Sequence, residues 1–92
     1  MDKYVFKLYI FDHTIRSQRA IENLKWICEN ELAGAYELSI VDLLEHPEAT
    51  AEEKIIATPT LVKKLPVPAE RIIGDLSNIE QVLEKLNIPM YL

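Results

Sequence analysis

The sequence predicts an α/β domain with the element order β-α-β-α-β-β-α and a mixed four-stranded sheet, and three observations favour it. Strand-type alternation opens the chain at residues 4–11. A helical pattern and a second strand pattern follow, which together indicate a βαβ crossover. Near the middle, the Thr58-Pro59 step opens a β-type run, because proline cannot donate to a ladder and pushes the preceding residue toward extended geometry.

The first half of the chain accounts for the crossover. Residues 4–11 are largely apolar on both faces, so we expect this strand at the centre of the sheet. Residues 12–14 supply cap-type side chains, and a helix with one apolar face is expected from about Ser17 to a stop at Gly34. Residues 36–42 predict the second strand. Its expected core positions are Leu38, Ile40 and Val41.

Prolines divide the second half. Pro47 is expected at the first position of a short acidic helix over residues 48–56, where its missing N–H matters least. Pro59 is expected to end that helix and to open a third strand over residues 60–65. Residues 66–68 then form a stiff Pro-Val-Pro turn.

The chain closes with a short strand and a helix. Residues 71–73 should pair with the preceding strand as a hairpin. Ser77 and Glu80 have the spacing of a capping box, with the serine at the cap. The helix that follows should end near Asn87, ahead of Pro89.

This order of elements is that of thioredoxin-like domains, which place a cis-proline between a helix and a hairpin downstream of a βαβ unit. We therefore expect Thr58 and Pro59 to form a structural cis-proline step. The chain has no internal repeat, low-complexity segment or linker, so residues 1–92 are expected to form a single domain.

Charge and composition exclude several classes of protein. The net charge of −5 and the pI of about 4.9 argue against nucleic acid or an anionic membrane as the main partner. No apolar run approaches the roughly 20 residues that span a bilayer. The amino terminus enters a strand pattern at once, unlike a signal peptide. The single cysteine permits no internal disulfide, so a cytoplasmic location is the default expectation.

Redox chemistry lacks its nucleophile. In thioredoxin-like enzymes the thiol sits where the first strand meets the first helix, and the helix N-terminus lowers its pKa. Residues 11–17 occupy that place and include no cysteine. Cys28 lies further along the apolar face of the helix and is expected to be a small buried hydrophobe. Dithiol chemistry is therefore excluded.

The sequence also contains no residue pattern typical of a metal site or of acid–base catalysis. His13 and His46 show no metal-type spacing, so no metal site or cofactor is expected. Trp26 borders the apolar stripe of its helix and is either half-buried packing or, if exposed, an interface anchor. The acidic residues of the second half indicate a solvated helix face. They are Glu45, Glu48, Glu52 and Glu53.

One catalytic alternative remains, a small glutathione-binding or transferase-like domain. Glutathione-dependent enzymes use this fold, pair a peptide main chain beside the cis-proline and hold a carboxylate at the start of the last helix. Thr58-Pro59 and residues 75–78 could imitate that site. The simpler interpretation is that Ser77 only caps its own helix. Such an enzyme would also need an activator near Tyr9 or Thr14.

The sequence resembles the circadian clock protein KaiB family over residues 3–86. Four stretches carry the resemblance, of which the last is the most specific. They are Lys7-Leu8-Tyr9, Ile40-Val41-Asp42-Leu43-Leu44 with Pro47, Ala57-Thr58-Pro59-Thr60-Leu61 and Arg71-Ile72-Ile73-Gly74-Asp75-Leu76-Ser77-Asn78. The sensor domain of the kinase SasA is similar in fold but shares less of the last stretch.

The resemblance implies a non-enzymatic module that binds a KaiC-type ATPase, with KaiA or a SasA-like kinase as further partners, in circadian or stress-related signalling. It implies partner contacts for Arg19, Lys63 and Arg71, with ordinary surface charge as the alternative. Family members also interconvert between a thioredoxin-like monomer and a tetramer of order βαββααβ, so that fold and a homo-oligomer are the alternatives here.

Lys85 and Asn87 are expected to decide the fold state. Residues 85–87 stand where the family commonly has Gly-Leu-Asp. Glycine costs about 1 kcal/mol more than alanine inside a helix, and lysine costs little. The last helix should therefore run further, and the chain should rest in the thioredoxin-like state. A third hypothesis is a structural oligomerisation module without a KaiC partner.

Overall fold

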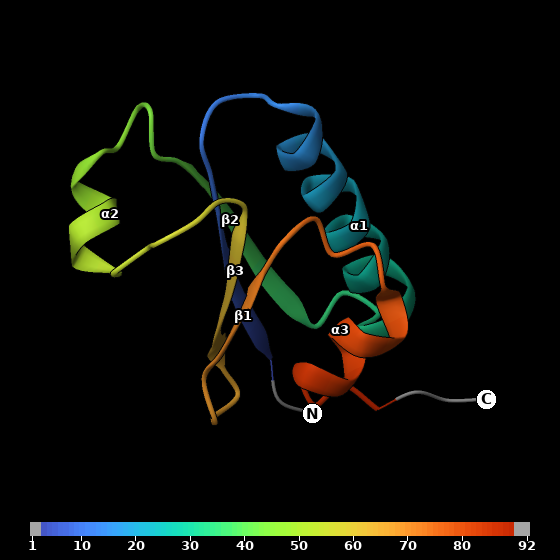
Figure 1. The fold of residues 1–92 in the computed structure, drawn as a ribbon. Coiled ribbons are helices and arrows are strands. Elements are labelled where there is room, and N and C mark those ends of the chain that lie inside the picture. Colours follow the sequence, from blue (N-terminus) through green and yellow to red (C-terminus); the bar gives the residue numbers. More distant parts are fainter. Residues whose placement is uncertain (1–2, 90–92) are drawn as a thin grey trace.

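The computed structural model describes residues 3–89 and has the element order β-α-β-α-β-β-α (Figure 1). The strands are β1 (Tyr4–Ile10), β2 (Tyr36–Asp42), β3 (Thr60–Leu65) and β4 (Glu70–Ile73). The helices are α1 (Ile15–Glu31), α2 (Glu48–Glu52) and α3 (Ile79–Lys85). This confirms the predicted thioredoxin-like order, and the alternative order βαββααβ is not the one observed.

The four strands form one mixed sheet in the order β2-β1-β3-β4. β1 runs parallel to β2 and antiparallel to β3, and β4 returns antiparallel beside β3. β1 is therefore central, as predicted, and Phe6 and Leu8 are fully buried. The expectation that Ile40 belongs to the core is wrong, because β2 is an outer strand and Ile40 is 40% exposed.

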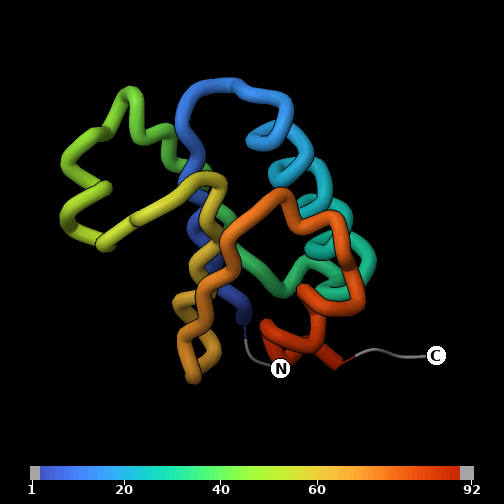
Figure 2. Tube along the Cα trace, in the orientation of Figure 1, coloured from blue at the N-terminus to red at the C-terminus, as the bar shows by residue number. Residues whose placement is uncertain are grey.

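Helices α1 and α3 cover one face of the sheet, and α2 with its flanking loops lies at the other (Figures 1 and 2). Alternate side chains of β1 serve the two faces. Leu8 belongs to the larger core cluster with Leu24 of α1 and Leu83 of α3, whereas Tyr9 joins Ile55 in a smaller cluster. Within the described residues, none of the helices is long and apolar enough to cross a membrane.

Helix α1 begins earlier than expected. Thr14 is its N-cap, and the Thr14 Oγ1 accepts a hydrogen bond from the Ser17 N–H at 3.1 Å. This geometry fits the cap-type residues predicted here and moves the start from Ser17 to Ile15. After the helix, Gly34 adopts a φ of 86°, which confirms the predicted stop.

Helix α2 is shorter than the predicted helix over residues 48–56, because it ends at Glu52. Lys54 adopts a φ of 54°, which is incompatible with a continuing right-handed helix. The expectation that Pro59 ends a helix is therefore wrong, although Pro59 does lead directly into β3. The Thr58–Pro59 peptide bond is cis, as predicted.

The cap of α3 also differs from the prediction. The Asn78 Oδ1 accepts the Gln81 N–H at 3.2 Å, so Asn78 and not Ser77 is the N-cap. The expected capping box of Ser77 and Glu80 is therefore wrong. The Ser77 N–H donates instead to the Asp75 Oδ1 at 3.1 Å, which holds the loop before the helix.

Lys63 closes the C-terminal end of α3 from inside the protein. It is only 1% exposed, and its Nζ donates a hydrogen bond to the Leu86 carbonyl at 3.0 Å. Leu86 is the C-cap of α3, so the ammonium satisfies a carbonyl at the negative end of the helix dipole. Asn87 follows with a φ of 58°, a conformation that asparagine tolerates well.

Replacing Lys63 by alanine should lower the free energy of unfolding by about 2–4 kcal/mol, since it removes a buried aliphatic stem and leaves the Leu86 carbonyl without its donor. Urea denaturation followed by circular dichroism measures the change. Lys25→Ala is the control, because Lys25 is exposed on α1 and its loss should alter stability by at most about 0.5 kcal/mol. Equal stabilities of the two variants would contradict this role of Lys63.

Candidate functional site

The turn between β1 and α1, where a redox domain would carry its thiol, is held by polar side chains. The Asp42 Oδ1 accepts the N–H groups of Asp12 at 3.0 Å and Leu44 at 2.9 Å. These two hydrogen bonds are the main reason that the pKa of Asp42 is lowered. Thr14 is engaged in capping α1. These hydrogen bonds stabilise the conformation of the turn. Because residues 11–17 contain no cysteine, no thiolate can form there.

Cys28 is fully buried in the larger core cluster, which confirms its expected packing role. Burial, with a smaller contribution from the charge of Glu29, raises the pKa of the Cys28 thiol to about 12. A thiol that stays protonated and inaccessible is a poor nucleophile. Within residues 3–89, no group of three His, Cys, Asp or Glu side chains is placed to hold a metal ion.

The start of α3 does not offer the open anion site that glutathione binding would need. The Asp75 carboxylate already accepts the Ser77 N–H, and the hydrogen bonds from the Ser77 side chain and main chain lower the pKa of Asp75. The Asp75 carbonyl in turn accepts a hydrogen bond from the Asn23 Nδ2 at 2.8 Å. A ligand carboxylate arriving here would meet a negative charge already in place.

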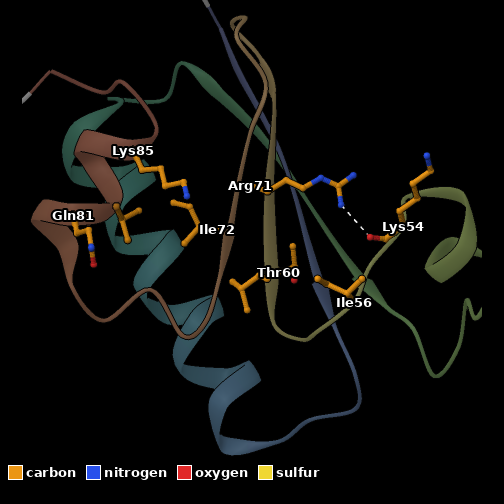
Figure 3. A pocket seen from close by; sticks show the side chains of 9 residues that line it. Lys54, Ile56, Thr60, Arg71, Ile72, Gln81 and Lys85 are labelled. Carbon is orange, nitrogen blue, oxygen red and sulfur yellow. Dashed lines mark hydrogen bonds between the residues drawn. The ribbon is translucent and has the colours of Figure 1, made fainter.

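A hollow of about 520 Å³ opens along β4, which we call the β4 hollow (Figure 3). Three segments line it: the loop between α2 and β3, the open end of the β3–β4 hairpin (the start of β3 and the end of β4), and α3. The lining residues are Lys54, Ile56, Thr60, Arg71, Ile72, Ile73, Gln81, Val82 and Lys85. Figure 3 shows Gln81 and Lys85 on one side of β4, and Lys54 with the Arg71 guanidinium on the other.

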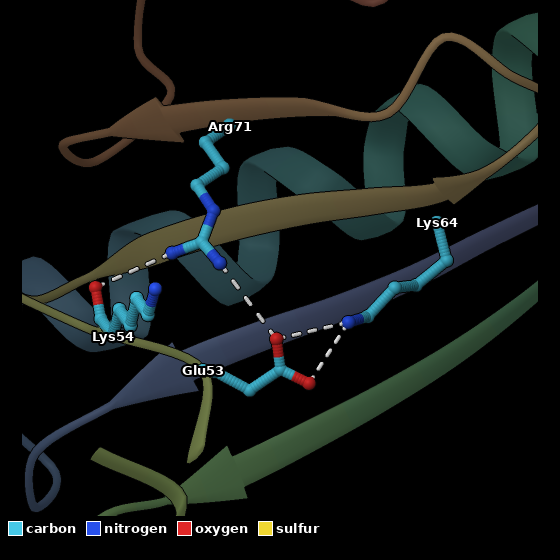
Figure 4. Close-up of polar contacts among 4 residues, drawn as sticks. All are labelled: Glu53, Lys54, Lys64 and Arg71. Atoms are coloured by element: carbon cyan, nitrogen blue, oxygen red, sulfur yellow. Dashed lines mark hydrogen bonds and ion pairs between the residues drawn. The ribbon is translucent and has the colours of Figure 1, made fainter. Parts of the chain in front are cut away.

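Arg71 is oriented at the β4 hollow by contacts with the segment that follows α2 (Figure 4). Its Nη2 lies 3.7 Å from the Glu53 Oε2, and its Nη1 donates to the Lys54 carbonyl at 3.4 Å. Glu53 accepts shorter hydrogen bonds from the Lys64 Nζ, at 2.8 and 3.0 Å, and these are the main cause of the lowered pKa of Glu53. Arg71 keeps 45% of its side chain exposed and has donors left for another anion.

The cations that the family resemblance assigns to partner contacts do not lie together. Arg71 points to the side of the sheet that α2 occupies, whereas Arg19 is exposed on α1 at the opposite face. The charge of Arg19, together with that of Arg16, contributes to the lowered pKa of Asp75, so Arg19 borders the loop before α3. Lys63 is buried beneath α3 and is not on the surface in this fold.

Sequence reasoning missed three residues that shape this region. The acidic pattern indicates a solvated helix face for Glu53, but the helix breaks before it and turns its carboxylate toward Lys64. Ile56 is 88% exposed beside the β4 hollow, and its position two residues before the Thr58-Pro59 step was the available signal. Lys54 gave no signal of its own. Trp26 is 48% exposed, so it remains a candidate interface anchor.

The sequence matches a known protein family and several of its characterised members. The KaiB domain model matches residues 7–88. The circadian clock protein KaiB3 of Synechocystis sp. is 50% identical over 88 residues, which cover 96% of this chain and 86% of KaiB3. The circadian clock oscillator protein KaiB of Thermosynechococcus vestitus is 51% identical over 85 residues, 92% of this chain and 79% of that protein.

Solved structures share the fold at much lower identity. The N-terminal domain of Synechococcus elongatus SasA superposes with a TM-score of 0.75 at 20% identity, over 100% of this chain and 90% of that one. Chloroplastic thioredoxin z gives a TM-score of 0.73 at 20% identity, over 94% of this chain and 80% of that one. The fold is thioredoxin-like, and by its sequence the chain belongs to the KaiB family.

Proposed function

We propose that this chain is a non-catalytic protein-binding module that docks on a KaiC-type ATPase and modulates circadian or stress-related signalling in the cytoplasm. The observation that carries the proposal is KaiB-family membership over residues 7–88. The absence of catalysis is supported by the turn before α1, whose side chains are engaged in structural hydrogen bonds, and by the inert, buried Cys28. The chain then acts through its surface.

Arg19 and Arg71 are the contact residues that we propose for the partner. Both are exposed. The ion pair with Glu53 orients Arg71 but leaves other guanidinium N–H groups of Arg71 available to a partner. Cations on a chain of net charge −5 favour a local acidic partner surface and give orientation to the encounter. Lys63, the third cation of the family pattern, acts on α3 in this fold and not on a partner.

A SasA-like kinase is proposed as a competitor and KaiA as a further partner. The N-terminal domain of SasA shares the fold with a TM-score of 0.75, so two domains of similar shape can bind one surface of an ATPase. We also propose that a tetrameric state is accessible, as the family resemblance implies. In that case only the competent fraction binds, and the apparent affinity falls with that fraction.

Binding to a KaiC-type ATPase should depend on the two exposed arginines. Arg71→Ala and Arg19→Ala should each weaken the complex about 5- to 30-fold, the usual effect of removing an important charged contact. Affinity measured by interferometry with the immobilised ATPase, with and without ATP, checks this, and Lys25→Ala is the control that should leave affinity unchanged. Failure of the unaltered chain to bind such an ATPase would instead favour the structural oligomerisation module.

Glutathione should not bind. The Asp75 carboxylate already occupies the loop before α3, so titration with glutathione should produce no saturable amide shifts near Pro59 or Ser77. The measurement is a series of two-dimensional amide spectra. Saturable shifts at both positions would revive the glutathione-binding alternative.

Lys85 and Asn87 together should bias the fold state. The double variant Lys85→Gly, Asn87→Asp should raise the tetramer fraction, because glycine in the last turn of α3 costs about 1 kcal/mol and fold-switching states differ by only a few kcal/mol. Size-exclusion chromatography with light scattering and amide spectra report the change. The control is Lys85→Ala, Asn87→Gly, which keeps a helix former and a residue suited to the positive φ. A double variant that behaves like this control counts against the assignment.

A further inference from the structure

The outer edge of β4 presents main-chain groups that the sheet does not use. The Gly74 N–H donates to the Pro59 carbonyl at 2.9 Å. Hydrogen-bonded and non-bonded pairs alternate along an antiparallel ladder. Arg71 and Ile73 therefore direct their N–H and C=O groups away from β3. Within residues 3–89 these groups have no main-chain partner, and they open on the β4 hollow.

The hollow provides side-chain contacts on both sides of that edge. Ile72 and Val82 supply apolar surface on the side of α3. Ile56 and Ile73, 88% and 54% exposed, supply it on the other side. Successive side chains of a strand point to opposite faces. A strand laid along β4 would therefore place its side chains alternately on these two walls.

The charge of the hollow selects the kind of strand. Lys54, Arg71 and Lys85 line it, and none of its lining residues is acidic, although the chain as a whole carries a net charge of −5. The sheet's other outer strand, β2, contains Glu37 and Asp42 and no cation, whereas β4 contains Arg71 and a single acidic residue, Glu70, which does not line the hollow. An acidic strand would be attracted at β4 and repelled at β2.

We propose that the β4 edge binds an extended acidic segment of a partner protein, which adds to the sheet as a strand beside β4. Main-chain hydrogen bonds to Arg71 and Ile73 supply affinity, and the surrounding cations select acidic sequences. β4 is short, a feature that limits indiscriminate edge pairing, so the charge is needed for recognition. The segment need not come from a KaiC-type ATPase, so this proposal and the proposed function can fail separately.

A second copy of the chain is the competing occupant of the edge. Two β4 edges facing each other would bring two sets of Lys54, Arg71 and Lys85 together, and like charges oppose that pairing. An acidic segment meets no such repulsion. Charge complementarity therefore favours the acidic partner over self-association.

The test uses the intact chain and, as the probe, the peptide acetyl-Glu-Glu-Val-Val-Glu-Glu-amide, which as a strand presents glutamate to both walls of the hollow. We expect saturable amide shifts at residues 71–74. Two peptides of the same length are the comparisons: one with lysine in place of glutamate, and one N-methylated at alternate positions, which cannot complete the main-chain pairing. Both should fail to produce these shifts. Equal binding of either comparison peptide, or shifts that map elsewhere, would overturn the proposal.

Charge variants of the chain locate the site. Lys54→Gln and Lys85→Gln should each weaken binding of the acidic peptide by about two- to fivefold, the range expected for an exposed ion pair. Lys25→Gln removes the same charge from α1 and should leave the affinity unchanged. Equal losses in all variants would overturn the assignment to β4. So would concentration-dependent broadening of residues 71–74 without peptide, because that result would assign the edge to a second copy.

Discussion

The hydrogen bond from the buried Lys63 ammonium to the Leu86 carbonyl is the contact on which the C-terminal half depends. Helix α3 is only 7 residues long, and helices of that length are not stable alone in water. It persists because its apolar face joins the core and because a cation from β3 completes its C-terminal end. With α3 held in place, one wall of the β4 hollow is also held in place.

On the opposite face of the sheet, a partly buried ion pair has a comparable role. Glu53 joins the segment after α2 to Lys64 of β3 and Arg71 of β4, and so shapes the second wall of the hollow. Meanwhile the carboxylate of Asp42 accepts the main-chain N–H of Asp12 in the turn after β1, and that of Asp75 accepts the N–H of Ser77 in its own loop. The polar groups that could have served chemistry are thus used to hold loops in place, while the exposed cations stay available for binding.

Local pattern predicted the strands well and the side-chain partners poorly. The second and third strands match the predicted residues 36–42 and 60–65, since alternation and flanking Gly, Asp or Pro residues are local properties. The misplaced features depend on contacts between distant segments. Lys63 looks like a surface cation in a strand, yet the register of β3 and the arrival of α3 bury it. Ile40 looks like a core residue, but strand order places it at an edge. The β4 hollow could not be predicted because its lining residues come from three segments that are separated in the sequence.

The most direct test of a thioredoxin-like docking module is to follow backbone chemical shifts of the isotope-labelled chain, free and bound to a KaiC-type ATPase. We predict strand shifts for residues 60–65 and helix shifts for residues 79–85 in both states, with changes on binding concentrated around Arg19 and Arg71. Strand shifts for residues 79–85 in the bound state would contradict the account, because the chain would then dock in the other element order.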